Sequence, residues 1–197
     1  KRYPQLDNGQ FTTIIDDSSY ARLVDTMADA QAKGATLVNL APGFEPNAAT
    51  RLLPPHLVLD APEDAAIMRE EIFGPLFPVR TYSNIDEVLS YINHRDRPLG
   101  LYLFSNDKDL TDRVVKNTIS GGVSINDCSF HVAQHDIPFG GIGASGMGHY
   151  HGHEGFIEFS KMRPIFSQFR FSALPLMYPP YGKVFRMLYS LMIKLKL

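Results

Sequence analysis

The sequence predicts an α/β fold built around a parallel sheet. Between residues 75 and 127, apolar runs typical of strands alternate with segments whose apolar side chains recur at helical spacing. Strands and helices that alternate over short connections form right-handed crossovers, which leave consecutive strands parallel. The composition agrees, because 44% hydrophobic and 20% charged residues over 197 positions are typical of a globular chain with a sizeable core.

The N-terminal part of the chain opens with a short strand and a helix. Weak alternation predicts the strand at residues 11–15, and the polar run at 16–19 supplies N-cap side chains for a helix that continues to about Lys33. Gly34 then ends the helix. The apolar face expected for this helix carries Ala21, Val24, Met27 and Ala28.

Three extended segments follow this helix. They lie at residues 35–40, 56–62 and 75–82, and a loop rich in Pro, Asn and Gly separates the first two. Pro78 interrupts the third segment, and because proline cannot donate to a strand ladder, this segment is expected at a sheet edge or a bulge.

The crossover units come next. Ser83 or Asn84 caps a helix with apolar residues at positions 85, 88, 89 and 92, and residues 99–105 form a buried strand. A second capped helix covers residues 106–120, and a strand at 121–127 completes the pattern. The second helix is expected to turn Leu110, Val114 and Val115 inward.

Periodicity is lost after residue 126. A glycine-rich loop precedes a short helix at residues 150–159, and residues 161–169 are extended. The tail beyond them ends in a basic amphipathic helix, whose apolar face carries Val184, Met187, Leu188, Leu191, Met192 and Leu195. We favour packing of this helix against the body of the protein or a second subunit over attachment to a membrane surface.

Charge and cysteine content narrow the partners and the compartment. A formal net charge of −2 provides no basic field for nucleic acid, so nucleic acid is not an expected partner. One cysteine, Cys128, excludes an intramolecular disulfide and agrees with a reducing compartment, so we expect a cytoplasmic protein without a signal peptide. Because the chain starts at Lys1 without an initiator methionine, we expect it to be part of a longer one.

The loop "GGIGASG" contains a literal G-x-G-x-x-G at Gly141, Gly143 and Gly146. A dinucleotide-binding fingerprint needs a strand leading into the first glycine and a helix opening at the last. Pro138 and Phe139 precede this loop instead, and it follows the crossover units. We therefore interpret the glycines as allowing positive φ and close backbone packing beside a binding cleft.

Other chemically reactive residues give weaker signals. His149 and His153 would share one face of a helix, yet no cysteine and only Glu154 accompanies them, so we favour hydrogen-bonded or solvated histidines over a metal site. Cys128 has no neighbouring base or helix N-terminus in the sequence, so we interpret it as structural.

The sharpest stretch is "REEIFGP" at residues 69–75. Two adjacent carboxylates followed by an aromatic residue and a Gly-Pro turn are compatible with a plain polar loop. The same residues could also present a carboxylate to ribose hydroxyls and a phenyl ring to a flat heterocycle. The residue types alone leave both interpretations open.

Taken in order, several motifs resemble the NAD(P)-dependent aldehyde dehydrogenase family, in particular its class 3 and coniferyl aldehyde dehydrogenase branch. The similarity runs from about residue 7 to residue 165 through "MREEIFGPLFPV", "PLGLYLFS", "SGGVSIND", "HDIPFGGIGASGMGHYHG" and "FIEFSKMRP". The resemblance implies an aldehyde substrate, NAD or NADP as cofactor, and a homodimer.

The resemblance also assigns roles to individual residues. It implies that Glu71 binds the nicotinamide ribose hydroxyls and that Phe73 packs beside the ribose and nicotinamide. It further implies that the walls of the aldehyde tunnel include Ser129, Phe130, His131 and Phe139.

The family nucleophile is a cysteine in a Gly-Gln-x-Cys motif upstream of the Glu-x-Phe-Gly-Pro stretch. This chain contains no such motif, and Cys128 lies downstream of that stretch, so the resemblance transfers no catalytic residue to it. We expect a partial catalytic domain at residues 1–160, an oligomerisation strand at 161–170 and a tail with an amphipathic helix at 171–197. The chain alone is therefore expected to be inactive.

Two other functions remain open at this stage. Residues 161–169 could supply the exposed edge of a non-catalytic assembly module. A semialdehyde or acyl-transferring dehydrogenase would share the fold, although "SFHVAQH" is more typical of the class 3 type.

Overall fold

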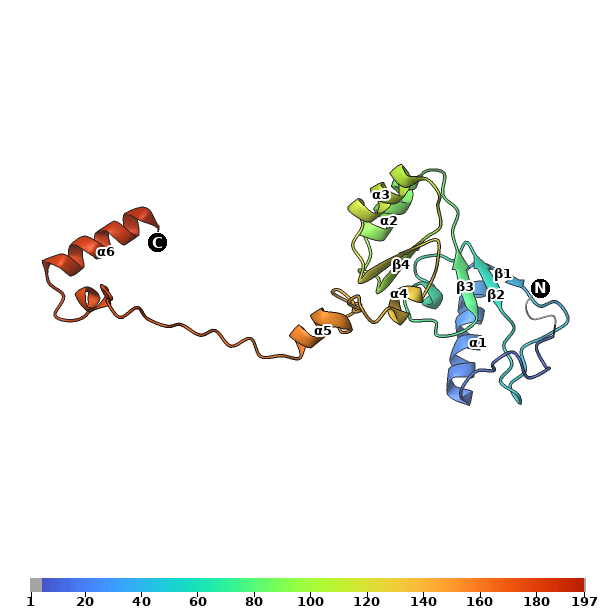
Figure 1. Ribbon diagram of the computed structural model, residues 1–197. Helices are drawn as coiled ribbons and strands as arrows, with labels where there is room; N and C mark the ends of the chain where they lie inside the picture. The colour runs from blue at the N-terminus through green and yellow to red at the C-terminus, as the bar shows by residue number, and fades with distance from the viewer. Residues whose placement is uncertain (1–4, 197) are drawn as a thin grey trace. The chain divides into compact units, whose positions relative to one another are not determined.

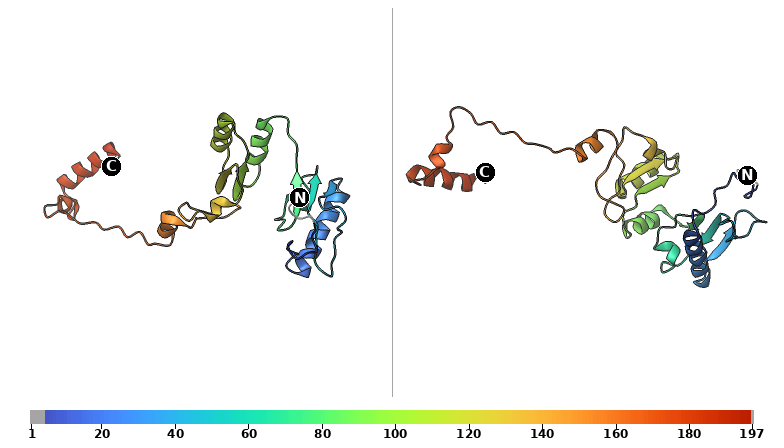
Figure 2. Two further views of the ribbon diagram at one scale, coloured as in Figure 1. Left: turned by 45° about the vertical axis from the view of Figure 1, so that its right-hand side comes forward. Right: turned by 90° about the horizontal axis from the view of Figure 1, so that it is seen from below.

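The computed structural model describes residues 5–196, and the chain divides between His94 and Arg95 into two compact units. The first unit joins the helix α1 (Asp17–Ala32) to a three-stranded sheet of β1 (Thr36–Asn39), β2 (His56–Leu59) and β3 (Leu76–Val79), with α1 along one face (Figures 1 and 2). Strand β2 is central, antiparallel to β1 and parallel to β3. The sheet of the first unit is therefore mixed, with one antiparallel pair and one parallel pair of strands.

Helix α1 has the predicted bounds because both of its ends are capped. The Asp16 carboxylate accepts a hydrogen bond from the Ser19 N–H at 2.7 Å. This bond stabilises the charged carboxylate and is the largest cause of a pKa of Asp16 below its ordinary value. Lys33 ends the helix, and Gly34 follows with φ +98°, a left-handed conformation that glycine adopts without strain.

The core of the first unit lies between α1 and the sheet. Fully or nearly fully buried members include Tyr20, Leu23, Ala30, Leu53, Val58, Ile67 and Leu76. The apolar face predicted for α1 was therefore partly wrong, since Ala21 and Ala28 are exposed. The buried row includes Thr26, whose hydroxyl donates to the Arg22 carbonyl at 2.8 Å, and this bond lets a polar side chain be buried.

The structure tests the strand predicted at residues 11–15 and the edge position predicted for Pro78. Residues 11–15 form no strand, because the Ile14 N–H donates to the Arg51 carbonyl at 3.0 Å and Ile15 points into solvent, 84% exposed. Pro78 lies in β3 opposite Val58, and β3 is at the end of the strand order, so the predicted edge position is confirmed.

Two short elements complete the first unit. The 3-10 helix η1 (Ala66–Met68) precedes the loop that leads to β3, and α2 (Ile85–Asn93) follows β3. Asn84 is the cap of α2: its side-chain oxygen accepts the Glu87 N–H at 3.1 Å, while its amide donates to the Glu87 carboxylate at 2.8 Å. This reciprocal pair selects Asn84 over Ser83 as the cap.

The second unit contains the second of the two predicted parallel crossovers. The first, from residues 75–82 to residues 99–105, does not place its strands in one sheet, because β3 pairs with β2 instead. Strand β4 (Gly100–Leu103) pairs in parallel with β5 (Gly122–Ile125), and α3 (Lys108–Asn117) connects them (Figure 1). Val114 of α3 is buried as expected, but Val115 is 40% exposed and was wrongly placed inside. Strand β4 is only half-buried, with Tyr102 43% exposed, because the sheet has two strands here.

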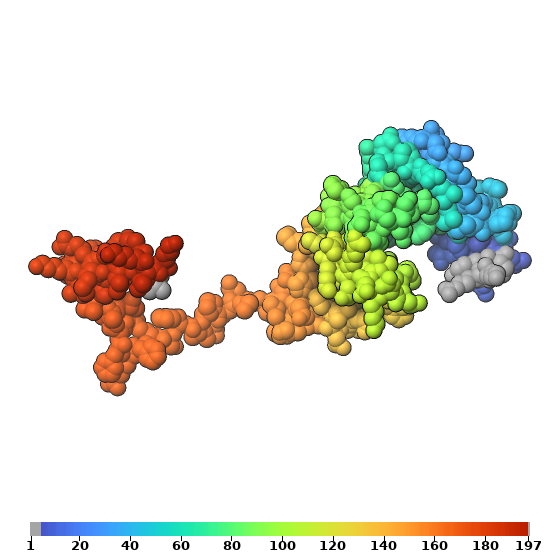
Figure 3. All heavy atoms as spheres, turned by 90° about the horizontal axis from the view of Figure 1, so that it is seen from above, coloured from blue at the N-terminus to red at the C-terminus, as the bar shows by residue number. Residues whose placement is uncertain are grey.

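The remainder of the chain is mostly irregular. Two short helices, α4 (Phe130–Ala133) and α5 (Gly152–Glu158), flank the glycine loop, and residues 161–170 contain no helix or strand. The tail forms a 3-10 helix, η2 (Leu174–Met177), and the predicted amphipathic helix α6 (Lys183–Leu195), which contact each other (Figure 3). Within residues 5–196, no helix combines the length and apolar character needed to cross a membrane.

Candidate functional site

The first candidate region is the loop between η1 and β3, which carries Glu71 and Phe73. Both side chains are exposed, and the Phe73 ring has 82% of its surface open to solvent. Phe73 also has φ +44°, a left-handed conformation that is uncommon for a bulky residue. An exposed aromatic ring on a backbone in this conformation requires that the surrounding structure hold the loop in place.

Arg22 of α1 supplies part of this support. Its guanidinium donates to two successive main-chain carbonyls, that of Glu71 at 3.2 Å and that of Ile72 at 2.7 Å. The Ile72 side chain packs against the core of the first unit. The backbone is therefore fixed from two directions, while the Glu71 carboxylate stays exposed.

Gly74 lets the same loop approach α1 closely. A Cβ atom built at Gly74 would lie 2.5 Å from Cδ1 and 2.6 Å from Cδ2 of Leu23, and Leu23 is fully buried. Carbon atoms normally meet at about 3.5 to 4.0 Å. The contact with Leu23 therefore favours glycine at this position, because any larger residue would push the Leu23 methyl groups aside.

Further along α1, an ion pair holds the start of η1. The Asp29 carboxylate accepts the Lys33 ammonium at 2.8 Å and the Ala66 N–H at 2.8 Å. Lys33 also donates to the carbonyl of Asp64 at 2.8 Å. The Lys33 hydrogen bond first, and the Ala66 N–H second, lower the pKa of Asp29 below its ordinary value of 3.8.

The second candidate region lies in the second unit, after β5. Ser129 is exposed and begins α4 with φ +64°, while Phe130 is 63% exposed. Cys128 is also exposed as a free thiol, and its backbone N–H donates to the Asp127 carboxylate at 2.7 Å. Ser129 and Phe130 therefore offer a hydroxyl and an apolar ring at the surface of this unit.

His131 is placed differently from these two residues, because it packs on the β4–β5 sheet. Gly100 and Gly122 face each other across the two strands, and a Cβ at Gly122 would lie 2.9 Å from the imidazole. The imidazole Nδ1 and the Ser124 hydroxyl are 3.2 Å apart. The other nitrogen, Nε2, is buried and has no hydrogen-bond partner among residues 5–196.

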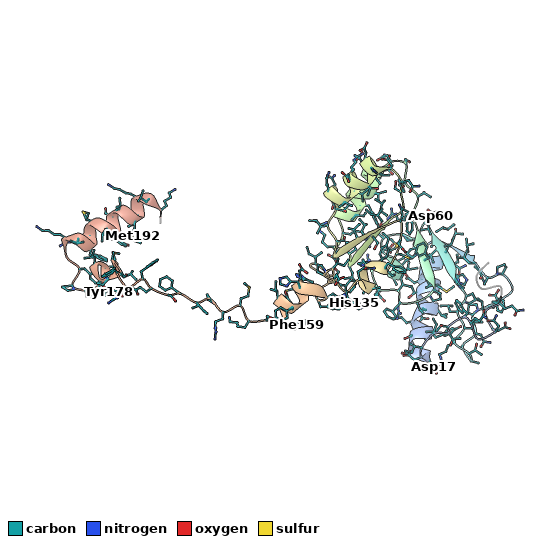
Figure 4. All side chains as sticks on the ribbon, viewed as in Figure 1. Asp17, Asp60, His135, Phe159, Tyr178 and Met192 are labelled. Carbon is teal, nitrogen blue, oxygen red and sulfur yellow. The ribbon has the colours of Figure 1, made fainter. Side chains whose placement is uncertain are left out.

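Phe139 joins His131 to a cluster of rings. Its centroid lies 5.5 Å from that of His131 and 5.6 Å from that of Tyr150, and Phe139 and Tyr150 exchange two backbone hydrogen bonds. His151 stacks near Phe139 at 6.3 Å and meets His135 at 5.3 Å (His135 is labelled in Figure 4). These contacts bring two of the predicted substrate residues, His131 and Phe139, together.

The glycine loop has the role that the sequence predicted. Gly143, Gly146 and Gly148 all have positive φ, and a Cβ at Gly141 would lie 2.0 Å from the Ser145 carbonyl oxygen. The loop borders a hollow of about 260 Å³ whose lining includes Ser120, Gly121, Pro138 and His149. The predicted positive φ and close backbone packing are therefore confirmed, whereas a binding role for the hollow stays a prediction.

Among the histidines of the "HYHGH" stretch, His151 contributes ring contacts. Its ring centroid lies 4.4 Å from that of Tyr150, edge to face, and its Nδ1 is buried without a partner in the described part of the chain. Among residues 5–196, no three His, Cys, Asp or Glu side chains are grouped to hold a metal ion.

A family model of the aldehyde dehydrogenase family matches residues 3–165. The chain belongs to the aldehyde dehydrogenase family. This match confirms the resemblance seen in the sequence, and similar solved aldehyde dehydrogenases confirm the α/β fold class. The family comprises NAD(P)-dependent oxidoreductases.

Individual aldehyde dehydrogenases agree with this assignment. A probable coniferyl aldehyde dehydrogenase of Pseudomonas aeruginosa is 50% identical over 98% of this chain and 40% of its own length. The substrate-bound state of Staphylococcus aureus AldH has 36% identity and a TM-score of 0.72 over 94% of this chain and 39% of its own. Pseudomonas syringae aldehyde dehydrogenase C with NAD⁺ and octanal has 28% identity and a TM-score of 0.65 over 75% and 30%. The chain spans about two fifths of the length of the curated relatives it matches.

Sequence reasoning missed the residues that support the candidate aldehyde dehydrogenase site. Arg22 and Asp29 hold backbone groups more than thirty positions away, and no local pattern indicates such bonds. Tyr150 and His151 lie in a stretch that was considered for a metal site and for the family resemblance, and neither interpretation predicted their ring contacts. The many aromatic rings near the glycine loop were the one available signal for their stacking.

Proposed function

We propose that this chain forms part of the catalytic domain of an NAD(P)-dependent aldehyde dehydrogenase that oxidises an aldehyde to its carboxylic acid. The proposed substrate is an aromatic aldehyde of the coniferyl type, and the relative of that name, similar over 98% of this chain, supports the choice. The observation that carries the proposal is that Arg22 holds the backbone of a loop in which the Glu71 carboxylate and the Phe73 ring are exposed.

The loop fits the nicotinamide half of the cofactor. Glu71 is an exposed hydrogen-bond acceptor on a fixed backbone, and a ribose offers two neighbouring hydroxyl donors. The exposed Phe73 ring, two positions further on, offers an apolar face to the ribose and the nicotinamide ring. The bound NAD or NADP would accept a hydride from the substrate.

The aldehyde would contact the second unit. Phe130 provides an exposed apolar ring and Ser129 a hydroxyl, while Phe139 and His131 form a pair of packed rings. An aromatic substrate gains contact area and favourable ring packing on such a surface. We assign these four residues to the walls of the aldehyde tunnel.

The attacking thiolate is proposed to come from a Gly-Gln-x-Cys motif, which this chain does not contain. Cys128 is the only thiol, and it follows β5 where the family places no nucleophile. We therefore expect the 197-residue chain to have no turnover. A spectrophotometric assay of NAD⁺ or NADP⁺ reduction with coniferyl aldehyde tests this, and activity that disappears in Cys128→Ser would overturn the assignment of Cys128.

Binding of the half-cofactor tests Glu71 directly. Nicotinamide mononucleotide carries the ribose and the nicotinamide, and saturation-transfer NMR detects weak binding to the chain. Loss of a charge-assisted hydrogen bond in Glu71→Gln should weaken binding about tenfold. The matched control Glu70→Gln neutralises the adjacent exposed carboxylate and should leave binding unchanged. Equal effects of the two substitutions would contradict the proposal.

We also propose that residues 161–170 pair with a second copy in a homodimer. This segment has no strand partner within the described residues, and it exposes Ile165, Phe166 and Phe169 by 78%, 85% and 86%. Phe166→Asp should shift the mass measured by light scattering toward the monomer. Phe171→Asp, outside the segment, is the control.

The exposed free thiol of Cys128 is compatible with a reducing compartment, and we propose that the enzyme acts in the cytoplasm.

A further inference from the structure

The tail at residues 171–197 is strongly asymmetric in charge. It contains Lys183, Arg186, Lys194 and Lys196 and no acidic residue, and the last acidic residue of the chain is Glu158. The whole chain has 19 Lys and Arg and 21 Asp and Glu, so the other 170 residues carry 15 cations and 21 anions. A cationic segment on an otherwise acidic chain indicates an anionic partner for the tail.

Helix α6 gathers its charged residues on one side, with Met187 and Ile193 at the borders of that side. At about 100° per residue, Lys183, Arg186 and Lys194 fall within an arc of about 80°. The opposite side carries Leu188, Leu191, Met192 and Leu195 together with Val184. The helix therefore has one cationic face and one broad apolar face.

An aromatic ladder flanks the apolar face. The rings of Tyr181 and Phe185 lie 4.6 Å apart, and those of Phe185 and Tyr189 lie 5.7 Å apart and nearly parallel. Tyr189 is 52% exposed and Tyr181 is 58% exposed. Tyrosine, with an apolar ring and a polar hydroxyl, is enriched where hydrocarbon meets water.

The 3-10 helix η2 covers only part of the apolar face. Leu174 and Met177 of η2 and the apolar side chains of α6 line a hollow of about 310 Å³ (Met192 of α6 and Tyr178, which follows η2, are labelled in Figure 4). Leu191 remains 51% exposed and Leu195 59% exposed. The face thus retains apolar area that no contact in the described tail removes from water.

We propose that this tail binds the surface of an anionic phospholipid bilayer, with α6 lying in the plane of the interface. Three occupants of the apolar face compete. Pairing with the tail of a second copy would bring cations together with no acidic residue to compensate. The acidic remainder of the chain would attract the cationic face and leave the apolar face uncovered. An anionic bilayer attracts the cations and buries the apolar face together.

This proposal replaces packing of the helix, which the sequence alone favoured, and it does not depend on the proposed enzymatic function. It describes attachment along the surface, since α6 is too short to span a bilayer. The cytoplasmic leaflet, which is rich in anionic lipid, is the surface we expect.

Sedimentation with vesicles tests the proposal on the full chain. Vesicles of phosphatidylcholine and phosphatidylserine in equal parts should sediment the protein at low salt, whereas pure phosphatidylcholine should not. High salt should release most of the protein, because the Debye length falls from about 10 Å at 0.1 M to about 3 Å at 1 M. Binding to neither type of vesicle would overturn the proposal.

Paired neutralisations show which cations act. Each cation near the surface contributes about a fivefold increase in partitioning, so Lys183→Gln with Arg186→Gln should reduce it about 25-fold. Lys108→Gln with Lys116→Gln makes the same charge change in α3 and should leave partitioning unchanged. An equal loss in both pairs would mean that net charge alone drives sedimentation, and the tail assignment would fail.

A tryptophan reporter identifies the occupant of the apolar face. The chain has no tryptophan, so Tyr189→Trp places a single indole beside that face. Its emission should shift to the blue only when anionic vesicles are added, with circular dichroism confirming that the variant is folded. Blue-shifted emission without vesicles would overturn the proposal. If that shift depends on protein concentration, a second copy covers the apolar face; if it does not, the chain's own body covers it.

Discussion

Replacing Gly74 by alanine should destabilise the first unit, and the structure explains why. Gly74 does not have positive φ, so alanine fits its backbone conformation. The new Cβ would nevertheless lie 2.5 and 2.6 Å from the two methyl carbons of Leu23, about 1 Å closer than carbon atoms normally approach. Leu23 is fully buried, so its methyl groups can yield only by rotating within the core.

The expected cost follows from this overlap. Overpacking a close-packed core costs about 1 to 3 kcal/mol, and the Leu23 methyls can rotate in part, so we expect about 2 kcal/mol for Gly74→Ala. With a slope of about 2 kcal/mol per molar urea, the midpoint should fall by about 1 M. Circular dichroism reports the transition, and hydrogen exchange at the α1 amides assigns it to the first unit.

A double-mutant cycle separates the contact from other causes. Leu23→Ala alone should cost about 2 to 5 kcal/mol, but it removes the methyl groups that Gly74→Ala meets. In the Leu23→Ala background, Gly74→Ala should therefore cost less than about 0.5 kcal/mol. In the control Gly182→Ala no atom lies within 4 Å of the new Cβ; it changes only the N-cap of α6 in the second unit and should leave hydrogen exchange at the α1 amides unchanged. A cost that is equal in both backgrounds would refute the reasoning.

Three more substitutions have defined outcomes. Gly122→Ala places a Cβ 2.9 Å from the His131 ring, so the free energy of unfolding in urea should fall by about 1 kcal/mol and the imidazole NMR signals should shift. Asn84→Ala removes the cap of α2 and should cost about 1 kcal/mol in urea unfolding, with faster amide exchange in its first turn. In Asp29→Asn the Lys33 pair is lost. Because the folded-state pKa of Asp29 lies below 3.8, the ion pair stabilises the fold above that pH. The difference in free energy of unfolding between Asp29→Asn and the wild type, measured in urea, should therefore disappear as the pH falls below 3.8.

Local sequence signals predicted the elements well where the physics is local. The caps at Asp16 and Asn84 and the stop at Gly34 act within a few positions, and the structure places helix ends at all three. The strand expected at residues 11–15 failed because its only support was weak alternation. No strand pairs with this segment, and the Ile14 N–H donates to the carbonyl of Arg51 in a loop.

The family resemblance named the candidate site residues, which stay a prediction, but the sequence did not indicate the contacts that support them. A resemblance across ordered motifs pointed to Glu71 and Phe73, which the structure leaves exposed. Nothing in the sequence showed that His131 would lie over two facing glycines, because that contact joins β4, β5 and α4. Close approaches of this kind depend on the pairing register of two strands.

The way Arg22 holds the loop that carries Glu71 and Phe73 bears on how the proposed site works. Its guanidinium donates to the main-chain oxygens of Glu71 and Ile72, and no bond joins it to the Glu71 carboxylate. Had the arginine paired with that carboxylate, it would compete with the ribose hydroxyls for the same oxygens. Because the fork of the guanidinium spans two successive carbonyls, the backbone is held while the carboxylate stays available. A lysine, with a single compact ammonium, lacks the planar fork needed to reproduce this arrangement.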